Sequence, residues 1–250
     1  MREDLFPRDL CVELRTLRDD TAQHSFAHTL AEVEAASGRR LKDLFLSFDT
    51  DPVASGSIAQ VHRATLRPEF CPSGAPTSVA VKVRHPGVEH VLQQDLDLAA
   101  AALNGLRMVP GLSQLAPPVA LDEFSRVLRR QADLRLEAAN LDAFTHNFRD
   151  RGYLHVTFPQ PIRGLVSKAV LIETWEEGST IQDFVDVSSR FNQGLASRGY
   201  DIFLSMLLLD NHMHGDTHSG NIFVRLRDSR SGLLLDWRPV QARGTGEARS

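Results

Sequence analysis

The chain has 250 residues, 42% of them hydrophobic, which is enough for one large domain or for two small lobes with buried cores. Its net charge of −4 and the absence of a basic stripe with interleaved aromatic residues argue against a nucleic-acid-binding role. Two cysteines, Cys11 and Cys71, make neither a disulfide framework nor a CxxC metal pair, and no apolar run approaches the ~20 residues of a membrane-spanning helix.

The N-terminal part of the chain has the apolar spacing of helices. Its first ten residues, MREDLFPRDL, lack the acid-poor, Arg- and Ser-rich character of a transit peptide, so we expect no targeting segment here. Helices are predicted over 8–20 and 25–36. The stretch 41–48 is predicted to add one or two helical turns before Pro52 breaks the pattern.

Two strands and a long helical region follow. Residues 58–66 and 78–85 alternate with a period of two, and the Pro/Gly/Ser-rich stretch 67–77 joins them, so we predict an antiparallel hairpin with a long tip. Helical pattern dominates 86–150. A break at 109–118 should divide it, with a second helix over 119–149.

Strands return in the last hundred residues. Strands are predicted over 154–158 and 169–175, and a short helix over 180–186. A long buried helix is predicted over 189–214 and a final hairpin over 222–226 and 232–237. The tail over 237–250 is predicted to be loop or disordered.

The stretch HMHGDTHSGN, residues 212–221, concentrates polar chemistry in a short segment. One interpretation is a hydrolytic metal site built on His212, His214, Asp216 and His218. The metallo-β-lactamase-type pattern HxHxDH is one residue shorter before its last histidine, and no histidine follows His218 to supply a further ligand. A metallohydrolase therefore stays open as an alternative.

The second interpretation is phosphoryl transfer. Asp216 and Asn221 have the spacing of a kinase catalytic loop, and the following hairpin delivers Asp236 as a possible metal ligand. Upstream, VAVK ends at Lys82 on a predicted strand, matching the VAIK pattern of kinases. Each residue alone has an ordinary structural explanation, but their common order favours a kinase-like architecture.

Four segments together resemble the aarF-domain-containing (UbiB) atypical kinases over about residues 1–236. They are PVASGSIAQVHRATL, VAVKVRHPGV, LRLEAANLDAF and HGDTHSGNIFV, and QADLRLEAANL is similar to the aarF-domain-containing kinase 2 branch. The resemblance implies an α+β, protein-kinase-like two-lobed fold that binds ATP and Mg²⁺. It further implies a mitochondrial location for the full-length parent and partners in lipid homeostasis or coenzyme Q biosynthesis.

The same resemblance implies a role for each matching residue. Ala54, Ser55, Gly56 and Ser57 would form the nucleotide loop, where the family more often has AAAS, and Gly56 would make it more permissive. Lys82 would contact the α- and β-phosphates, oriented by Glu137. Adenine would bind the hinge from Glu173 to Trp175, Asp216 would be catalytic, and Asn221 and Asp236 would hold Mg²⁺.

The resemblance also gives a domain plan. It has a helical extension at 1–50, a kinase-like N-lobe at 51–178 with a helical insert at 86–150, the start of an incomplete C-lobe with the catalytic loop at 179–236, and a disordered tail at 237–250. Departures from the family pattern are Gln131 in place of an acidic residue, Ser219 in place of a proline, and Trp237 in place of an early glycine after the metal aspartate.

We also expect the chain to be truncated at both ends. The family's KxGQ segment would precede Met1, and most C-lobe helices would follow the last residue. The expected function is ATP–Mg²⁺ binding with phosphoryl transfer or ATP hydrolysis. The alternative is a non-catalytic nucleotide-binding or scaffold fragment.

Overall fold

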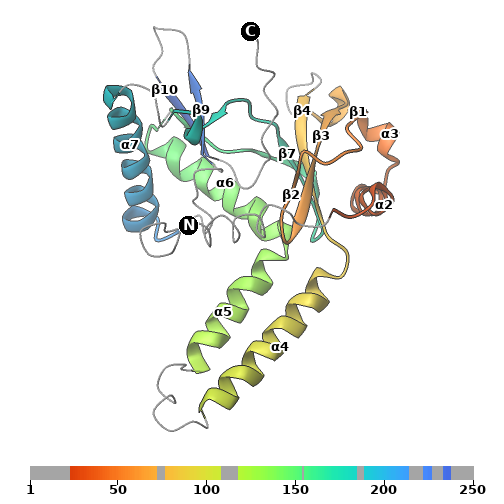
Figure 1. Ribbon diagram of the computed structural model, residues 1–250. Coiled ribbons are helices and arrows are strands. Elements are labelled where there is room, and N and C mark those ends of the chain that lie inside the picture. Colours follow the sequence, from red (N-terminus) through yellow and green to blue (C-terminus); the bar gives the residue numbers. More distant parts are fainter. Residues whose placement is uncertain are drawn as a thin grey trace.

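The computed structural model of the protein describes residues 23–71, 77–107, 118–153, 155–184, 189–213, 222–226 and 233–237. The predicted helix over 8–20 and the tail after Trp237 lie outside the described residues. Two sheets and the helices between them form the α+β architecture that the sequence predicts (Figure 1). No helix within the described ranges is both long and apolar enough to cross a membrane.

The first sheet has six strands with antiparallel pairing, in the order β1-β3-β4-β7-β6, and β2 adds to β3. Its strands are β1 (Phe45–Phe48), β2 (Ala54–Ser55), β3 (Ala59–Leu66), β4 (Thr77–Arg84), β6 (Pro161–Val166) and β7 (Val170–Thr174). The predicted hairpin is β3 and β4, with Val61 opposite Lys82. Its connection includes a short 3-10 turn, η1 (Pro68–Phe70).

The face of β4 that carries Val79, Val81 and Val83 is buried against the helix α2 (Phe26–Ser37). All three valines are fully buried, and Val33 of α2 lies in the same core. Because successive side chains of a strand point to opposite faces, Lys82 lies on the other face of β4. The period of two in the sequence therefore places the lysine away from this core.

Two edges of the first sheet differ from the sequence-based expectation. The prediction of helical turns over 41–48 is half right, because α3 (Leu41–Leu44) ends where β1 begins. β1 pairs with β3, and Phe45 is buried, so pairing and burial outweigh the helical pattern. Strand β6 was not predicted, because Pro161 and Gly164 are unusual in strands. Both residues are tolerated here because β6 lies at the edge of the sheet.

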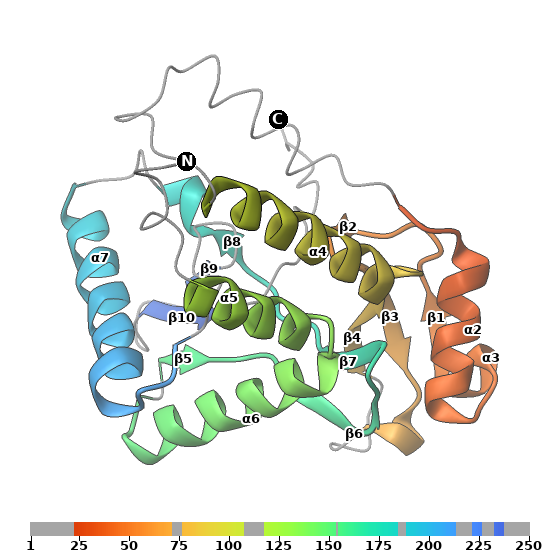
Figure 2. The ribbon, with the colours of Figure 1, turned by 90° about the horizontal axis from the view of Figure 1, so that it is seen from below.

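The helical region forms α4 (Val88–Arg107), α5 (Pro118–Gln131) and α6 (Leu134–Asp150). The prediction of one helix over 119–149 is wrong, because the chain breaks after Gln131 and Asp133 caps the next helix. Its carboxylate accepts a hydrogen bond from the backbone N–H of Arg135 at 3.1 Å. Figures 1 and 2 show α4 and α5 side by side, projecting from the body, while α6 lies between α7 and the first sheet.

The second sheet has four strands in the order β5-β10-β9-β8. They are β5 (Val156–Thr157), β8 (Ser179–Thr180), β9 (Ile222–Leu226) and β10 (Leu233–Trp237). The predicted final hairpin is confirmed as β9 and β10. The predicted short helix is the 3-10 turn η2 (Ile181–Phe184), and β5 pairs parallel to β10 although it lies in the range expected for the N-lobe.

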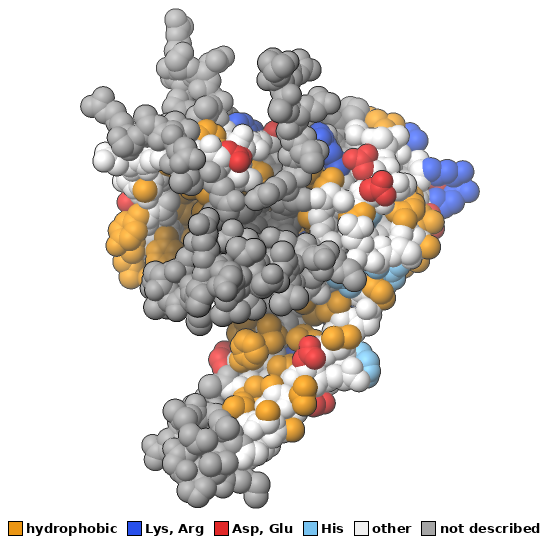
Figure 3. Space-filling view, viewed as in Figure 1, with side chains coloured by type: hydrophobic (Ala, Val, Ile, Leu, Met, Phe, Trp, Pro, Cys, Tyr) orange, Lys and Arg blue, Asp and Glu red, His pale blue; other side chains and the backbone are white. Residues whose placement is uncertain are grey.

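The long buried helix predicted over 189–214 is shorter and more exposed. It comprises α7 (Ser189–Leu204) and one π-helical turn, η3 (Ser205–Leu209). Ile202 and Met206 are buried, but other apolar side chains of this segment are exposed, and hydrophobic side chains gather at this side of the molecule (Figure 3). The exposed apolar side chains are Tyr200, Phe203, Leu207, Leu208 and Leu209.

A second core joins α6, α7 and the second sheet. Phe144 and Phe148 of α6 are almost fully buried there with Phe158. Beside it, the guanidinium of Arg151 donates two hydrogen bonds to the carboxylate of Asp210, at 2.8 and 2.7 Å. This pair ties the end of α6 to the residue that follows η3, just before the polar segment of the sequence.

Candidate nucleotide site

The centre of the candidate site is an ion pair between β4 and α6. Lys82 Nζ lies 2.8 Å from both Oε1 and Oε2 of Glu137, and the two side chains are 15% and 21% exposed. The strand alternation turns Lys82 away from the valine core, and Glu137 lies one helical turn after the Asp133 cap. The structure thus brings together the lysine and glutamate that the sequence predicts as partners.

A cavity of about 580 Å³ opens beside this pair. Gly56 and Ser57 line it from the loop after β2, Lys82 and Glu137 from the sheet and α6, and Met213 from the start of the polar segment. This volume lies within the roughly 300–1,000 Å³ of small-molecule sites. Two of the four expected nucleotide-loop residues, Gly56 and Ser57, therefore share one cavity with Lys82 and Met213. Ala54 and Ser55 form β2, pair with β3 and are not among the lining residues.

The loop at Gly56 has a conformation that other residues also adopt. Its backbone N–H donates to the Ala59 carbonyl at 2.9 Å, and its own carbonyl accepts a hydrogen bond from His85 Nε2 at 2.9 Å. The described residues in the left-handed region do not include Gly56, and an added Cβ would lie 3.7 Å from the nearest atom, the Ala59 oxygen. Gly56 is therefore not required for this conformation, and the family's alanine fits the same turn.

Behind the loop lies a network of histidines that sequence reasoning missed. His24 Nδ1 and His85 Nδ1 are 2.7 Å apart, and His24 Nε2 is 3.0 Å from Thr29 Oγ1. Thr29 Oγ1 continues to His62 Nε2 at 3.2 Å, and the amide of Gln60 bonds to His62 at 3.0 Å. No local spacing signals this network, because its members come from three separate segments.

The hydrogen bonds fix the proton positions of the neutral rings. His85 Nε2 donates to the Gly56 carbonyl, so His85 Nδ1 accepts from His24 Nδ1. His24 Nε2 is then an acceptor, and so is His62 Nε2, because His62 Nδ1 donates to the Asp49 carbonyl; the single Thr29 hydroxyl proton serves one of these two nitrogens at a time. Burial, followed by the neighbouring His85, lowers the pKa of His24 to about 4. Burial likewise lowers the pKa of His85 and of His62. A second proton on either ring at the His24–His85 contact removes an acceptor from the network.

The histidine network predicts that the protein loses stability in mild acid. Because the pKa of His24 is about 4 in the folded chain, against 6.5 for an unperturbed histidine, the unfolded chain binds more protons between these values. The contribution of His24 to the free energy of unfolding is therefore fully present above pH 6.5 and decreases as the pH drops towards 4. A series of melting temperatures across this range should fall less steeply in His24→Gln. His90→Gln, at an exposed histidine, serves as control and should follow the parent chain; equal slopes for all three would contradict the prediction.

The structure describes only the start of the polar segment. His212 stacks on Phe144 with ring centroids 4.6 Å apart, and the backbone N–H of His212 donates to the Met206 carbonyl at 3.0 Å. His214, Asp216, His218, Ser219 and Asn221 lie outside the described residues. Within the described part of the chain, no group of three or more His, Cys, Asp or Glu side chains is arranged to hold a metal ion.

The remaining expected site residues lie in or beside strands. Glu173 of β7 is buried, and the backbone N–H of Trp175 donates to the Ser78 carbonyl at 2.9 Å, so sheet pairing occupies that donor. The residues that line the cavity do not include Glu173 or Trp175. Asp236 is part of β10, with its backbone opposite Phe223 and Thr157. Their adenine- and metal-binding roles stay predictions.

Two residues beside Glu137 also line the cavity, Gln131 and Asp133. Asp133 is held by the guanidinium of Arg135 at 2.9 and 2.6 Å. This hydrogen bonding lowers the pKa of Asp133 below its usual range. The carboxylate is thus engaged in capping α6, and the neighbouring amide of Gln131 brings no charge to the cavity.

Several curated proteins are similar to this chain in sequence. The probable serine/threonine-protein kinase abkC of Dictyostelium discoideum is 38% identical over 94% of the chain and 33% of its own length. The mitochondrial ABC1 family protein YPL109C of Saccharomyces cerevisiae is 30% identical, with 90% and 36% covered. The probable protein kinase UbiB of Pseudomonas fluorescens is 31% identical, with 89% and 41% covered.

The fold matches a solved structure of Mycobacterium tuberculosis Rv3197 in complex with erythromycin. The TM-score is 0.64 at 26% identity, over 94% of this chain and 56% of the solved one. The chain thus spans between 33% and 41% of the length of these curated relatives. The family model of the ABC1 atypical kinase-like domain matches residues 16–240, and the chain therefore belongs to the ABC1 atypical kinase-like family.

Proposed function

We propose that this chain contributes the nucleotide-binding part of an ABC1 protein that binds ATP with Mg²⁺ and supports phosphoryl transfer or ATP hydrolysis. The observation that carries the proposal is the Lys82–Glu137 ion pair on the wall of the cavity. A lysine held by a helical glutamate presents a fixed ammonium group to phosphate oxygens. The pair is partly buried, so solvent screens it less than a surface pair.

The cavity residues suit the chemistry of a nucleotide. Lys82 supplies a positive charge for phosphate, and Ser57 supplies a hydroxyl on the loop. Ala59, Val61 and Leu141 supply apolar surface on which a planar base can pack. A nucleotide and this cavity therefore agree in charge, polarity and size.

The other roles are proposed from the family pattern. In this scheme Ala54, Ser55, Gly56 and Ser57 follow the phosphates, and the segment from Glu173 to Trp175 lies along the adenine. Asp216 positions the attacking group, while the oxygens of Asn221 and Asp236 hold Mg²⁺, which neutralises charge on the phosphates. Met213 already lines the cavity, and only two residues of sequence separate it from Asp216.

We further propose a mitochondrial setting for the full-length protein. The relatives from Saccharomyces cerevisiae and Schizosaccharomyces pombe are named mitochondrial, in agreement with the location expected from the sequence. Bacterial relatives carry the name UbiB, which favours a role connected with coenzyme Q biosynthesis or lipid homeostasis. For the phosphoryl acceptor we propose a molecule that takes part in coenzyme Q biosynthesis or lipid homeostasis.

The proposal predicts magnesium-dependent stabilisation of the chain by ATP. With ATP at about a hundred times its dissociation constant, stabilisation should reach about 2.7 kcal/mol, visible as a rise in melting temperature. Omitting Mg²⁺, or substituting Asp236→Asn, should reduce that rise. The exposed pair Arg40–Asp43 provides the matched control Asp43→Asn, which should keep the full response. A melting temperature that does not change when ATP and Mg²⁺ are added would refute nucleotide binding.

One observation favours the second candidate, a non-catalytic nucleotide-binding or scaffold fragment. Strand β10 continues through Trp237, which pairs with Ile222, so the backbone makes no turn directly after Asp236. A metal aspartate followed by an early glycine is the pattern expected for the active family. The two candidates differ in turnover: binding of ATP without measurable release of phosphate supports the second, and release of phosphate that Asp216→Asn abolishes supports the first.

A further inference from the structure

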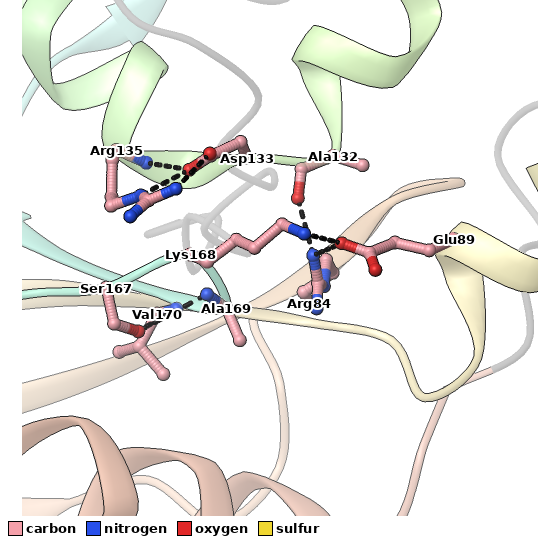
Figure 4. A network of polar contacts seen from close by, with 9 residues as sticks. All are labelled: Arg84, Glu89, Ala132, Asp133, Arg135, Ser167, Lys168, Ala169 and Val170. Atoms are coloured by element: carbon pink, nitrogen blue, oxygen red, sulfur yellow. Dashed lines mark hydrogen bonds and ion pairs between the residues drawn. The ribbon is translucent and has the colours of Figure 1, made fainter.

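Arg84 lies two residues after Lys82 on β4 and connects this strand to the junction between α5 and α6. Its guanidinium Nη1 donates to the Ala132 carbonyl at 2.8 Å and to Glu89 Oε1 at 2.7 Å. Figure 4 shows the side chain of Arg84 reaching towards Ala132 from the sheet, with Glu89 entering from the start of α4. Three segments of the chain thus meet at one guanidinium.

The junction depends on contacts of this kind because its backbone groups are buried where a helix ends. Ala132 is 2% exposed, and carbonyls at the end of a helix have no partner within that helix. Arg84 supplies the partner for this one. Next to it, the N–H of Leu134 donates to the Lys168 carbonyl at 3.1 Å, from the turn between β6 and β7. The start of α6 is therefore held to the first sheet at two adjacent points.

Arg84 is itself fixed by its surroundings. Its backbone N–H donates to the Ala169 carbonyl at 2.9 Å, and its carbonyl accepts a hydrogen bond from His28 Nε2 at 3.1 Å. Its side chain is 18% exposed, and the Glu89 carboxylate that holds it is also paired with Lys168. Because its backbone is hydrogen-bonded within the first sheet and its guanidinium is held by Glu89, Arg84 fixes the junction relative to β4.

We propose that Arg84 is a positioning residue that sets the Lys82–Glu137 pair by holding the start of α6 against β4. Glu137 lies one helical turn after Asp133, so a shift of the junction moves Glu137 relative to Lys82. The two oxygens of Glu137 both lie 2.8 Å from Lys82 Nζ, a geometry that a small shift of the helix breaks. The importance of Arg84 for catalysis rests on the proposed nucleotide function, but the integrity of the Lys82–Glu137 pair can be measured without nucleotide.

The chemical reactivity of Lys82 provides that measurement. The lysines of the chain are Lys42, Lys82 and Lys168, so limiting acetylation followed by peptide mass spectrometry reads each separately. An amine held in an ion pair is a poor nucleophile, and Lys42 is exposed and serves as internal standard. In Arg84→Met we expect the ratio of Lys82 to Lys42 acetylation to rise roughly threefold or more, within the range of coupling between residues of one network.

Two variants keep this test specific. Arg126→Met removes a guanidinium from α5 that is 65% exposed and paired with Glu123, and it should leave the ratio unchanged. Arg84→Lys keeps a donor at the junction and should restore a low ratio. If Arg84→Met fails to fold, Glu89→Gln loosens the same guanidinium from an exposed position and is read in its place. A ratio equal to that of the parent chain in the folded variant overturns the proposal.

A double-mutant cycle on ATP–Mg²⁺ affinity then tests the route of the effect. Arg84→Met should weaken binding about threefold or more in the parent chain and have no further effect in a Glu137→Gln background. Losses that simply add overturn the positioning role, because Arg84 then acts independently of Glu137. If the parent chain fails to bind ATP–Mg²⁺, the proposed function fails, and the acetylation ratio still decides whether Arg84 positions the pair.

Discussion

Lys82→Met is expected to weaken ATP–Mg²⁺ binding strongly while the chain stays folded. The ammonium is the positive charge that the cavity wall offers to phosphate, and truncating one partner of a desolvated charge pair costs roughly 2–5 kcal/mol of binding free energy. This corresponds to an affinity about 30-fold lower or worse. Titration of a fluorescent ATP analogue in the presence of Mg²⁺ measures it, with circular dichroism as the check on folding.

Two further variants separate the charge of Lys82 from its orientation. Glu137→Gln keeps the lysine but removes the carboxylate that orients it, so we expect an intermediate loss of affinity. Lys42→Met removes an exposed lysine of α3 and should bind the analogue like the parent chain. If Lys82→Met binds with parental affinity, the ion pair is structural and the proposed role of Lys82 is wrong.

The second large effect is expected from Phe144→Ala. The ring is fully buried and stacks on Phe158, at 5.5 Å, and on His212, at 4.6 Å between centroids. Removing it leaves a cavity in the core, which typically costs about 3–5 kcal/mol. Because small domains have about 5–15 kcal/mol of stability in total, this loss is a large fraction of it. Urea denaturation followed by tryptophan fluorescence measures the change.

A matched control lies on α5. Phe124 is 55% exposed, so Phe124→Ala should change the free energy of unfolding by less than about 0.5 kcal/mol. Phe144→Ala should also weaken ATP–Mg²⁺ binding at temperatures where the chain remains folded, because His212, which stacks on Phe144, lines the cavity. A loss below about 1 kcal/mol would show that the second core closes around the missing ring.

Local pattern was enough to predict the elements whose signal is contained in a short stretch. The alternation of β3 and β4 predicted the hairpin, and with it the face on which Lys82 lies. The segment around Glu137 and the order of the motifs also predicted the kinase-like family. The strand prediction succeeds because a period of two follows directly from strand geometry, whereas the family was indicated by the resemblance of whole motifs.

Where pairing with a distant segment decides the outcome, local pattern failed. Phe45 belongs to a strand because it pairs with β3, although the helical pattern continues to it. The helical pattern runs through Asp133, where the structure breaks the helix, and the neighbouring backbone groups of Ala132 and Leu134 are paired there with Arg84 and Lys168 from distant segments. Helix and strand propensities are weak compared with burial and cross-strand pairing, so tertiary contacts override them.

The sequence by itself determined which residue types the chain places in kinase order: a strand lysine, a helical glutamate, and Asp216 and Asn221 at catalytic-loop spacing. The family resemblance already paired Lys82 with Glu137, but only the tertiary structure decided that this ion pair, between residues 55 apart, lies on the wall of a cavity. The tertiary structure also decided that His85 braces the loop at Gly56. The physical reason is that residue types and their periodicity are local properties, whereas a hydrogen bond or an ion pair exists only when separate segments are packed within about 3 Å.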